Sequence, residues 1–156
     1  MSQNTLDELA RLILRLVLGV LIFLHGWAKI RSGIGGIEAM LAMKGLPGFF
    51  AWGVYVGEVL APILLIAGIW SRMAAALIAI NMLVAVFLAH MGHLGQFTSS
   101  GGWQLELQAM FFVAALALMM LEGLFGVREG TVVNAMLVGI LIGFWRRLFG
   151  REAGTK

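Results

Sequence analysis

Four long apolar runs constrain this chain more than any other feature of its sequence. They cover residues 12–30, 49–70, 73–91 and 103–124, and each approaches the roughly 20 residues that a helix needs to cross a bilayer core of about 30 Å. Charged residues make up only 12% of the 156 residues, against about 25% in an average soluble domain. So few charges could not cover a surface in contact with water. The sequence therefore predicts an all-α membrane protein with a four-helix transmembrane bundle.

The last segment, residues 131–156, differs from these four runs. Residues 132–145 are almost wholly apolar, but they are too few for a typical membrane span, and basic residues follow them. Lys and Arg concentrate on the cytoplasmic side of membrane proteins. With a cytoplasmic N-terminus and four spans, eight of the eleven Lys and Arg residues lie inside, whereas a fifth crossing leaves only four there. We therefore predict a four-span domain over residues 1–130 and an interfacial or half-inserted helical tail over residues 131–156.

Cysteine content and net charge narrow the functional classes. The sequence contains no cysteine, which excludes disulfides, thiolate catalysis and thiolate metal sites. A net charge of +3 and a pI near 10.0 would suit nucleic acid binding, but the basic residues flank the apolar runs and form no patch of their own. The expected partner of these charges is the lipid bilayer, and we expect no nucleic acid partner.

Ionisable residues inside the predicted spans gather toward one side of the membrane. On this topology the first helix rises outward and carries His25 and Lys29 at its outer end. The third helix carries His90 and His93 at its outer end in the same way. The second helix descends from outside, which places Glu58 about 14 Å below its start at ~1.5 Å per residue. The helices therefore bring their polar groups to the outer half of the bilayer.

Glu58 is the hardest of these residues to explain as part of an inert bundle. A charge in mid-membrane costs roughly 2.5–3.5 kcal/mol on insertion scales, so it usually faces the bundle interior and a partner. We expect the Glu58 carboxyl to be protonated, or paired with Lys29, a histidine or a bound cation. Pro62 follows one turn later and would free a backbone carbonyl near it. Plainer roles stay open for other residues: a snorkelling Lys29, a loop His93, a helix-start Glu106, a helix–helix contact at Asn81, and interfacial charges at Glu38 and Glu122.

The segment His25-Gly26-Trp27-Ala28-Lys29-Ile30 resembles the DoxX family of small bacterial membrane proteins. Similar features follow in order, in Val56-Gly57-Glu58-Val59, in Asn81-Met82-Leu83-Val84-Ala85 leading to His90, and in Gly101-Gly102-Trp103-Gln104-Leu105-Glu106. The resemblance covers residues 9 to 130, and the chain beyond departs from the shorter family pattern. It implies a multi-pass, four-helix protein of the bacterial inner membrane. The polar core positions that it implies are Lys29, Glu58, His90 and Glu106.

The DoxX family includes a subunit of an archaeal thiosulfate:quinone oxidoreductase and members found with redox partners. The resemblance therefore implies a redox-associated membrane subunit that binds a quinone. Catalytic candidates, which would hydrogen-bond the quinone or exchange protons with it, are Glu58, His25 and His90. Candidates for binding the cofactor are Lys29, Glu106 and Trp103. The sequence has no cysteine cluster, haem-attachment motif or nucleotide-binding glycine loop, so electrons would come from a redox protein partner within a quinone-linked membrane oxidoreductase.

Three other functions stay open. In a metal-binding bundle, nitrogen and carboxylate ligands would suit zinc, iron or manganese, and the candidates are His25, Glu58, His90, His93 and Glu106. The Glu-x-x-His spacing of di-iron bundles is absent, so we assign no ligand set. The other two functions are small-solute transport and non-catalytic assembly. Small residues at Gly53-xxx-Gly57 and Gly139-xxx-Gly143 would allow close helix approach, including in a homodimer.

Overall fold

The computed structural model describes residues 3–122, which form helices joined by short connections. Within this range there is no β-strand, and the one isolated bridge pairs Phe97 with Trp103. The all-α fold expected from the apolar runs is confirmed. The predicted tail over residues 131–156, together with Gly139 and Gly143, lies outside the described residues, so the domain boundary stays a prediction.

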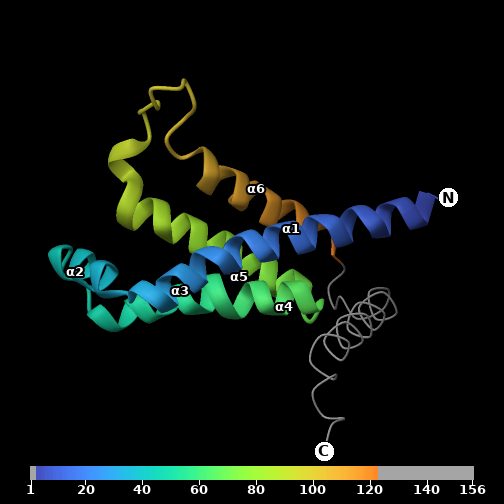
Figure 1. Cartoon of the computed structure of the whole chain (residues 1–156), viewed down its shortest axis with the longest axis horizontal. Helices are drawn as coiled ribbons and strands as arrows, with labels where there is room; N and C mark the ends of the chain where they lie inside the picture. Colours follow the sequence, from blue (N-terminus) through green and yellow to red (C-terminus); the bar gives the residue numbers. More distant parts are fainter. Residues whose placement is uncertain (1–2, 123–156) are drawn as a thin grey trace, which may run out of the picture.

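The first helix, α1 (Gln3–Ser32), is the longest among the described residues. At ~1.5 Å per residue its 30 residues reach about 45 Å, well beyond the hydrocarbon core of a bilayer. A turn at Gly33, which has a positive φ of 81°, leads into the short helix α2 (Gly35–Met43). In Figure 1, α2 lies at the end of the molecule opposite the N-terminus.

The second long helix is continuous from Gly48 to Ala67 but changes its winding along the way. It begins as the 3₁₀ helix η1 (Gly48–Trp52), passes through α3 (Gly53–Tyr55) and the π-helix η2 (Val56–Leu60), and ends as α4 (Ala61–Ala67). Gly68 and Trp70 then adopt left-handed conformations that reverse the chain. Pro47, which cannot donate a backbone hydrogen bond, precedes the first turn.

The third long helix changes its winding in a similar way. It runs as α5 (Ser71–Ala85), the π-helix η3 (Val86–His90) and the 3₁₀ turn η4 (Met91–His93). A loop then leads to α6 (Glu106–Leu121), which starts three residues later than the apolar run predicted over residues 103–124. Residues 103–105 belong to this loop because Trp103 pairs with Phe97 and its indole N–H donates to the Leu94 carbonyl at 2.9 Å.

Within residues 3–122, four helical rods pack around one core: α1, the Gly48–Ala67 helix, the Ser71–His93 helix and α6. Each rod contributes side chains that are almost inaccessible, such as Ile22, Leu65, Ile78 and Leu118. Alanines at the helix crossings let the backbones approach closely, as in other membrane bundles. A second, smaller cluster joins Ile34, Leu41 and Ala51 beside α2.

The outward surface of these rods is apolar. Ile80, Phe87, Met110 and Val113 are all more than half exposed, although they belong to helices that also form the core. Among the described residues, three helices are long and apolar enough to cross a membrane, Asn4–Ser32, Gly48–Ala67 and Ser71–His93. This pattern is that of a membrane protein whose outer face contacts lipid. The helix α6 is apolar but shorter, so its membrane crossing stays a prediction.

A buried ion pair joins the start of the bundle to the end of α6. Arg15 on α1 and Glu122 just after α6 approach to 3.8 Å, and their side chains are only 5% and 9% exposed. The sequence interpretation of Glu122 as an interfacial surface charge is therefore wrong. Glu122 directly follows the last residue of α6, and no pattern in the sequence indicates that α1 covers it. Glu38, interpreted in the same way, is exposed as expected.

Candidate functional site

Glu58 lies in the middle of the π-helix η2, where the second long helix passes between α1 and α5. A π-turn is rare and often occurs at functional sites. Pro62, four residues further on, has no N–H to give to the Glu58 carbonyl, so the ordinary α-helical hydrogen bond cannot form there. The sequence pointed to this local weakness through Pro62, but helical periodicity gives no signal for a π-turn.

The Glu58 carboxylate has a partner on each side. The Lys29 ammonium of α1 donates to Oε2 in an ion pair, and the Asn81 amide of α5 donates to Oε1 at 3.4 Å. The Glu58 side chain is 6% exposed, whereas that of Lys29 is 30% exposed. We call Lys29, Glu58 and Asn81 the polar cluster. Of the partners expected for Glu58, Lys29 is the one that contacts it in the structure. Asn81 makes the expected helix–helix contact, and its partner is the Glu58 carboxylate.

Two glycines allow the backbone of η2 to come this close to its neighbours. A Cβ on Gly26 of α1 would collide with the Glu58 carbonyl, and a Cβ on Gly57 would collide with the Asn81 side chain. Gly53, the other glycine of the predicted Gly-xxx-Gly pair, has open space around it. The close helix approach predicted for this Gly-xxx-Gly pair therefore occurs at Gly57, against Asn81 of the same chain, and not at Gly53.

The other sequence candidates do not join the polar cluster. The His25 ring bonds the Leu21 carbonyl at 2.8 Å through Nδ1 and meets the Phe111 ring of α6 edge to face. His90 and His93 contact each other, with their Nδ1 atoms 3.4 Å apart. Glu106 lies exposed in the first turn of α6, where its carboxylate folds toward Gly102. Over residues 3–122, no three histidine or acidic side chains gather in a group that could hold a metal ion.

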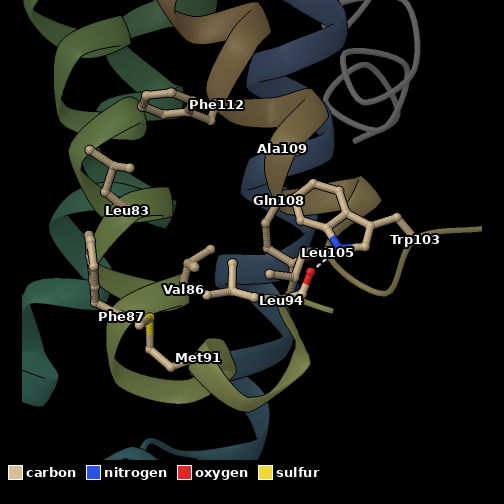
Figure 2. Close-up of a pocket in the computed structure, with 10 residues that line it drawn as sticks. All are labelled: Leu83, Val86, Phe87, Met91, Leu94, Trp103, Leu105, Gln108, Ala109 and Phe112. Carbon is tan, nitrogen blue, oxygen red and sulfur yellow. Dashed lines mark hydrogen bonds between the residues drawn. The ribbon is translucent and has the colours of Figure 1, made fainter. Parts of the chain in front are cut away.

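An apolar groove runs between the C-terminal half of the third long helix and α6 (Figure 2). Its volume is about 260 Å³, and its lining is apolar except for the Gln108 amide and the indole N–H of Trp103. The Trp103 indole closes one end, held by its hydrogen bond to Leu94. Asn81 and the groove residue Leu83 are two positions apart, so they face opposite sides of α5. The groove and the polar cluster are thus separate features.

The comparison with known proteins can be set beside this geometry. A family model for DoxX matches residues 10–91, more than half of the chain. This chain belongs to the DoxX family. The resemblance drawn from the sequence is confirmed, and the matched DoxX region contains every residue of the polar cluster. The helix α6 and the Trp103 side of the groove lie beyond it.

A curated relative gives a further indication for this DoxX protein. It is named "Putative oxidoreductase CatD", from Bacillus subtilis (strain 168), and is 29% identical over 83 residues. The aligned region is 53% of this chain and spans 61% of the length of that relative. No solved structure matches the chain.

Proposed function

We propose that this DoxX protein is a membrane subunit of an oxidoreductase system and that it binds a quinone at the polar cluster. The carrying observation is the Lys29–Glu58 ion pair inside the spanning helices, with Asn81 on the second carboxylate oxygen. An apolar bundle would avoid the cost of removing these charges from water, so their presence there is a reason to expect a function. The name of the Bacillus relative supports an oxidoreductase role.

The different exposure of the two charged groups suggests their separate tasks. The Lys29 ammonium is the more accessible and can donate a hydrogen bond to a carbonyl oxygen that approaches from the bilayer. Glu58 lies behind it, where it holds the ammonium in place. After Lys29 has given a proton to the quinone, Glu58 can take up a proton from water and pass it to Lys29. A quinone gains two electrons and two protons when it becomes a quinol, so a proton-exchanging pair in a dry site suits that chemistry.

Electrons have to reach such a site from another protein. The sequence has no cysteine to ligate an iron–sulfur cluster, and we therefore assign electron delivery to a redox partner of this subunit. Glu106 and His25 have no place in the proposed quinone site because the structure puts them in other surroundings. Trp103 belongs to the separate groove.

Binding of a short-chain quinone to the full chain in lipid nanodiscs tests the proposal. Wild-type protein should bind the quinone in titration calorimetry, and Lys29→Met and Glu58→Gln should each weaken binding by about tenfold or more, since a hydrogen bond to a charged group contributes about 1.5–3 kcal/mol. Ala109→Leu is the matched control, because Ala109 lines the groove and a larger side chain fills it. That variant should bind normally.

Two results would count against the proposal. If wild-type protein does not bind the quinone, the polar cluster is not a quinone site and a non-catalytic role is favoured. If Ala109→Leu abolishes binding while Lys29→Met preserves it, the quinone occupies the groove and the assignment to Lys29 and Glu58 is wrong.

A further inference from the structure

Five large apolar side chains are exposed where α2 leads into the second long helix, at the end of the molecule opposite the N-terminus (Figure 1). They are between 39% and 82% exposed, and we call them the apolar edge: Met43, Leu46, Phe49, Phe50 and Trp52. The Phe49 and Phe50 rings stack with their centres 4.3 Å apart. An exposed group of large apolar side chains marks a surface that meets a partner or a membrane. The proposed quinone site uses none of these residues.

The fold explains why these side chains remain uncovered. The inner side of this segment is already filled, because Ile34, Leu41 and Ala51 pack together in the second hydrophobic cluster. Within η1 the side chains at positions i and i+3 lie one above the other, so Phe49 and Trp52 share one face of that helix. Since Ala51 takes the inward position, the two aromatic side chains are left facing outward.

The apolar edge continues the lipid-facing surface of the second long helix. Beyond Trp52, the exposed large apolar residues of this helix are Val56, Leu60 and Ile63, whose spacing of three to four positions places them along one side. The Gly48–Ala67 helix has 20 residues, and at ~1.5 Å per residue it spans about 30 Å, the thickness of the hydrocarbon core. Its first turn, which carries Phe49, therefore falls at the boundary between hydrocarbon and headgroups.

We propose that the apolar edge inserts into this boundary and that α2 is an interfacial helix resting on the lipid surface. Amphipathic rings such as that of Trp52 accumulate at this depth in membranes. The exposed residues Arg31 and Lys44 bracket α2 along the chain, where their cationic groups can reach lipid phosphates. The partner of the apolar edge is thus the bilayer surface, and this contact fixes the depth of the bundle. The proposal is independent of quinone binding.

Nitroxide labels on single introduced cysteines test this contact, since the chain has no native cysteine. Phe49→Cys and Phe50→Cys report on the apolar edge, Leu60→Cys is the control for hydrocarbon, and Ser100→Cys, in the exposed loop before α6, is the control for water. The labelled full chain is placed in lipid nanodiscs wide enough for two copies. Spin relaxation is then measured with oxygen, which concentrates in hydrocarbon, and with a water-soluble nickel chelate.

The labels at Phe49 and Phe50 should relax faster with oxygen than with the chelate. This difference should be larger at Leu60 and reversed at Ser100. A membrane-impermeant maleimide should react with unlabelled Ser100→Cys, and this reaction should be lost at Phe49→Cys. Helix content close to that of the wild type would show that the variants are folded.

Two outcomes would overturn the proposal. If the labels at Phe49 and Phe50 respond to the two reagents as the label at Ser100 does, the apolar edge faces water. If they are immobilised and respond to neither reagent, a protein surface covers the edge, either another copy of the chain or another segment of the same one. The two edge positions are separate reporters, so each tests the proposal without the other.

Discussion

Lys29 and Glu58 contribute unequally to the stability of the bundle because they differ in their access to water. The Glu58 side chain is enclosed between α1 and α5, whereas nearly a third of the Lys29 side chain is exposed. Without its partner, the lysine can extend toward the headgroup region. The carboxylate has no similar path, since η2 holds it between its neighbours.

Lys29→Met should therefore destabilise the protein more than Glu58→Gln does. We expect a loss of about 2–3 kcal/mol for Lys29→Met, a buried-pair value reduced for the exposure of the lysine, and about 1 kcal/mol for Glu58→Gln. The double variant should lose less than the sum, because the two residues share one interaction. Reversible unfolding in detergent micelles measures all three. Strictly additive losses would contradict a direct pair.

Sequence reasoning found the buried carboxylate of the polar cluster but not all of its surroundings. Glu58 is conspicuous because a carboxylate in an apolar run is costly whichever way the helix faces, and Lys29 is one of few cations predicted in the same half of the bilayer. The direction of His25 could not be found in this way. Whether a side chain faces the polar cluster or Phe111 depends on the rotation of its helix. Packing sets this rotation, and the depth of a residue in the membrane does not reveal it.

At the scale of elements, α6 is the helix for which sequence and structure differ most. The sequence predicted that this helix starts at Trp103, but it starts at Glu106. Contacts with other segments fix both of its ends. Trp103 bonds Leu94 ahead of the helix, and Glu122 meets Arg15 behind it. Such contacts between distant segments leave no periodic pattern in the sequence, which explains why both were missed.

The two carboxylates at the ends of α6 should respond differently to neutralisation. Glu122→Gln should lower the free energy of unfolding by about 1–3 kcal/mol because it weakens a buried, charged contact with Arg15. Glu106→Gln should cost less than about 1 kcal/mol, since Glu106 is exposed and contributes mainly through the helix dipole. Denaturant titration of both variants under the same conditions provides the measurement. Equal losses would show that the Arg15–Glu122 contact does not stabilise the helix.

At the scale of the whole molecule, the apolar runs were enough to predict the fold class, and the motifs were enough to predict the family. A bilayer requires helices whose backbone groups are satisfied internally, so the length and charge content of each run largely decide the architecture. The orientation in the membrane depends on the charges at the helix ends, including those beyond residue 122. It stays a prediction that labelling can test.

The absence of native cysteine makes this test direct, because a single introduced cysteine is the sole target for a thiol reagent. Ser100→Cys lies in the exposed loop before α6, and Ile69→Cys lies in the turn after α4, where Ile69 is 53% exposed. With the N-terminus in the cytoplasm, a membrane-impermeant maleimide should label Ser100→Cys in intact cells and Ile69→Cys only after permeabilisation. The reverse pattern would place the N-terminus outside.

The π-turn around Glu58 has a consequence for comparing this protein with its relatives. A π-turn holds one more residue than the α-helical turn that it replaces, so a relative without it would have a chain shorter by one residue between Val56 and Leu60. An alignment that places this gap elsewhere would pair Glu58 with a neighbour that faces another side of the helix. The acidic position could then look variable across the family even where each protein keeps a carboxylate against α1.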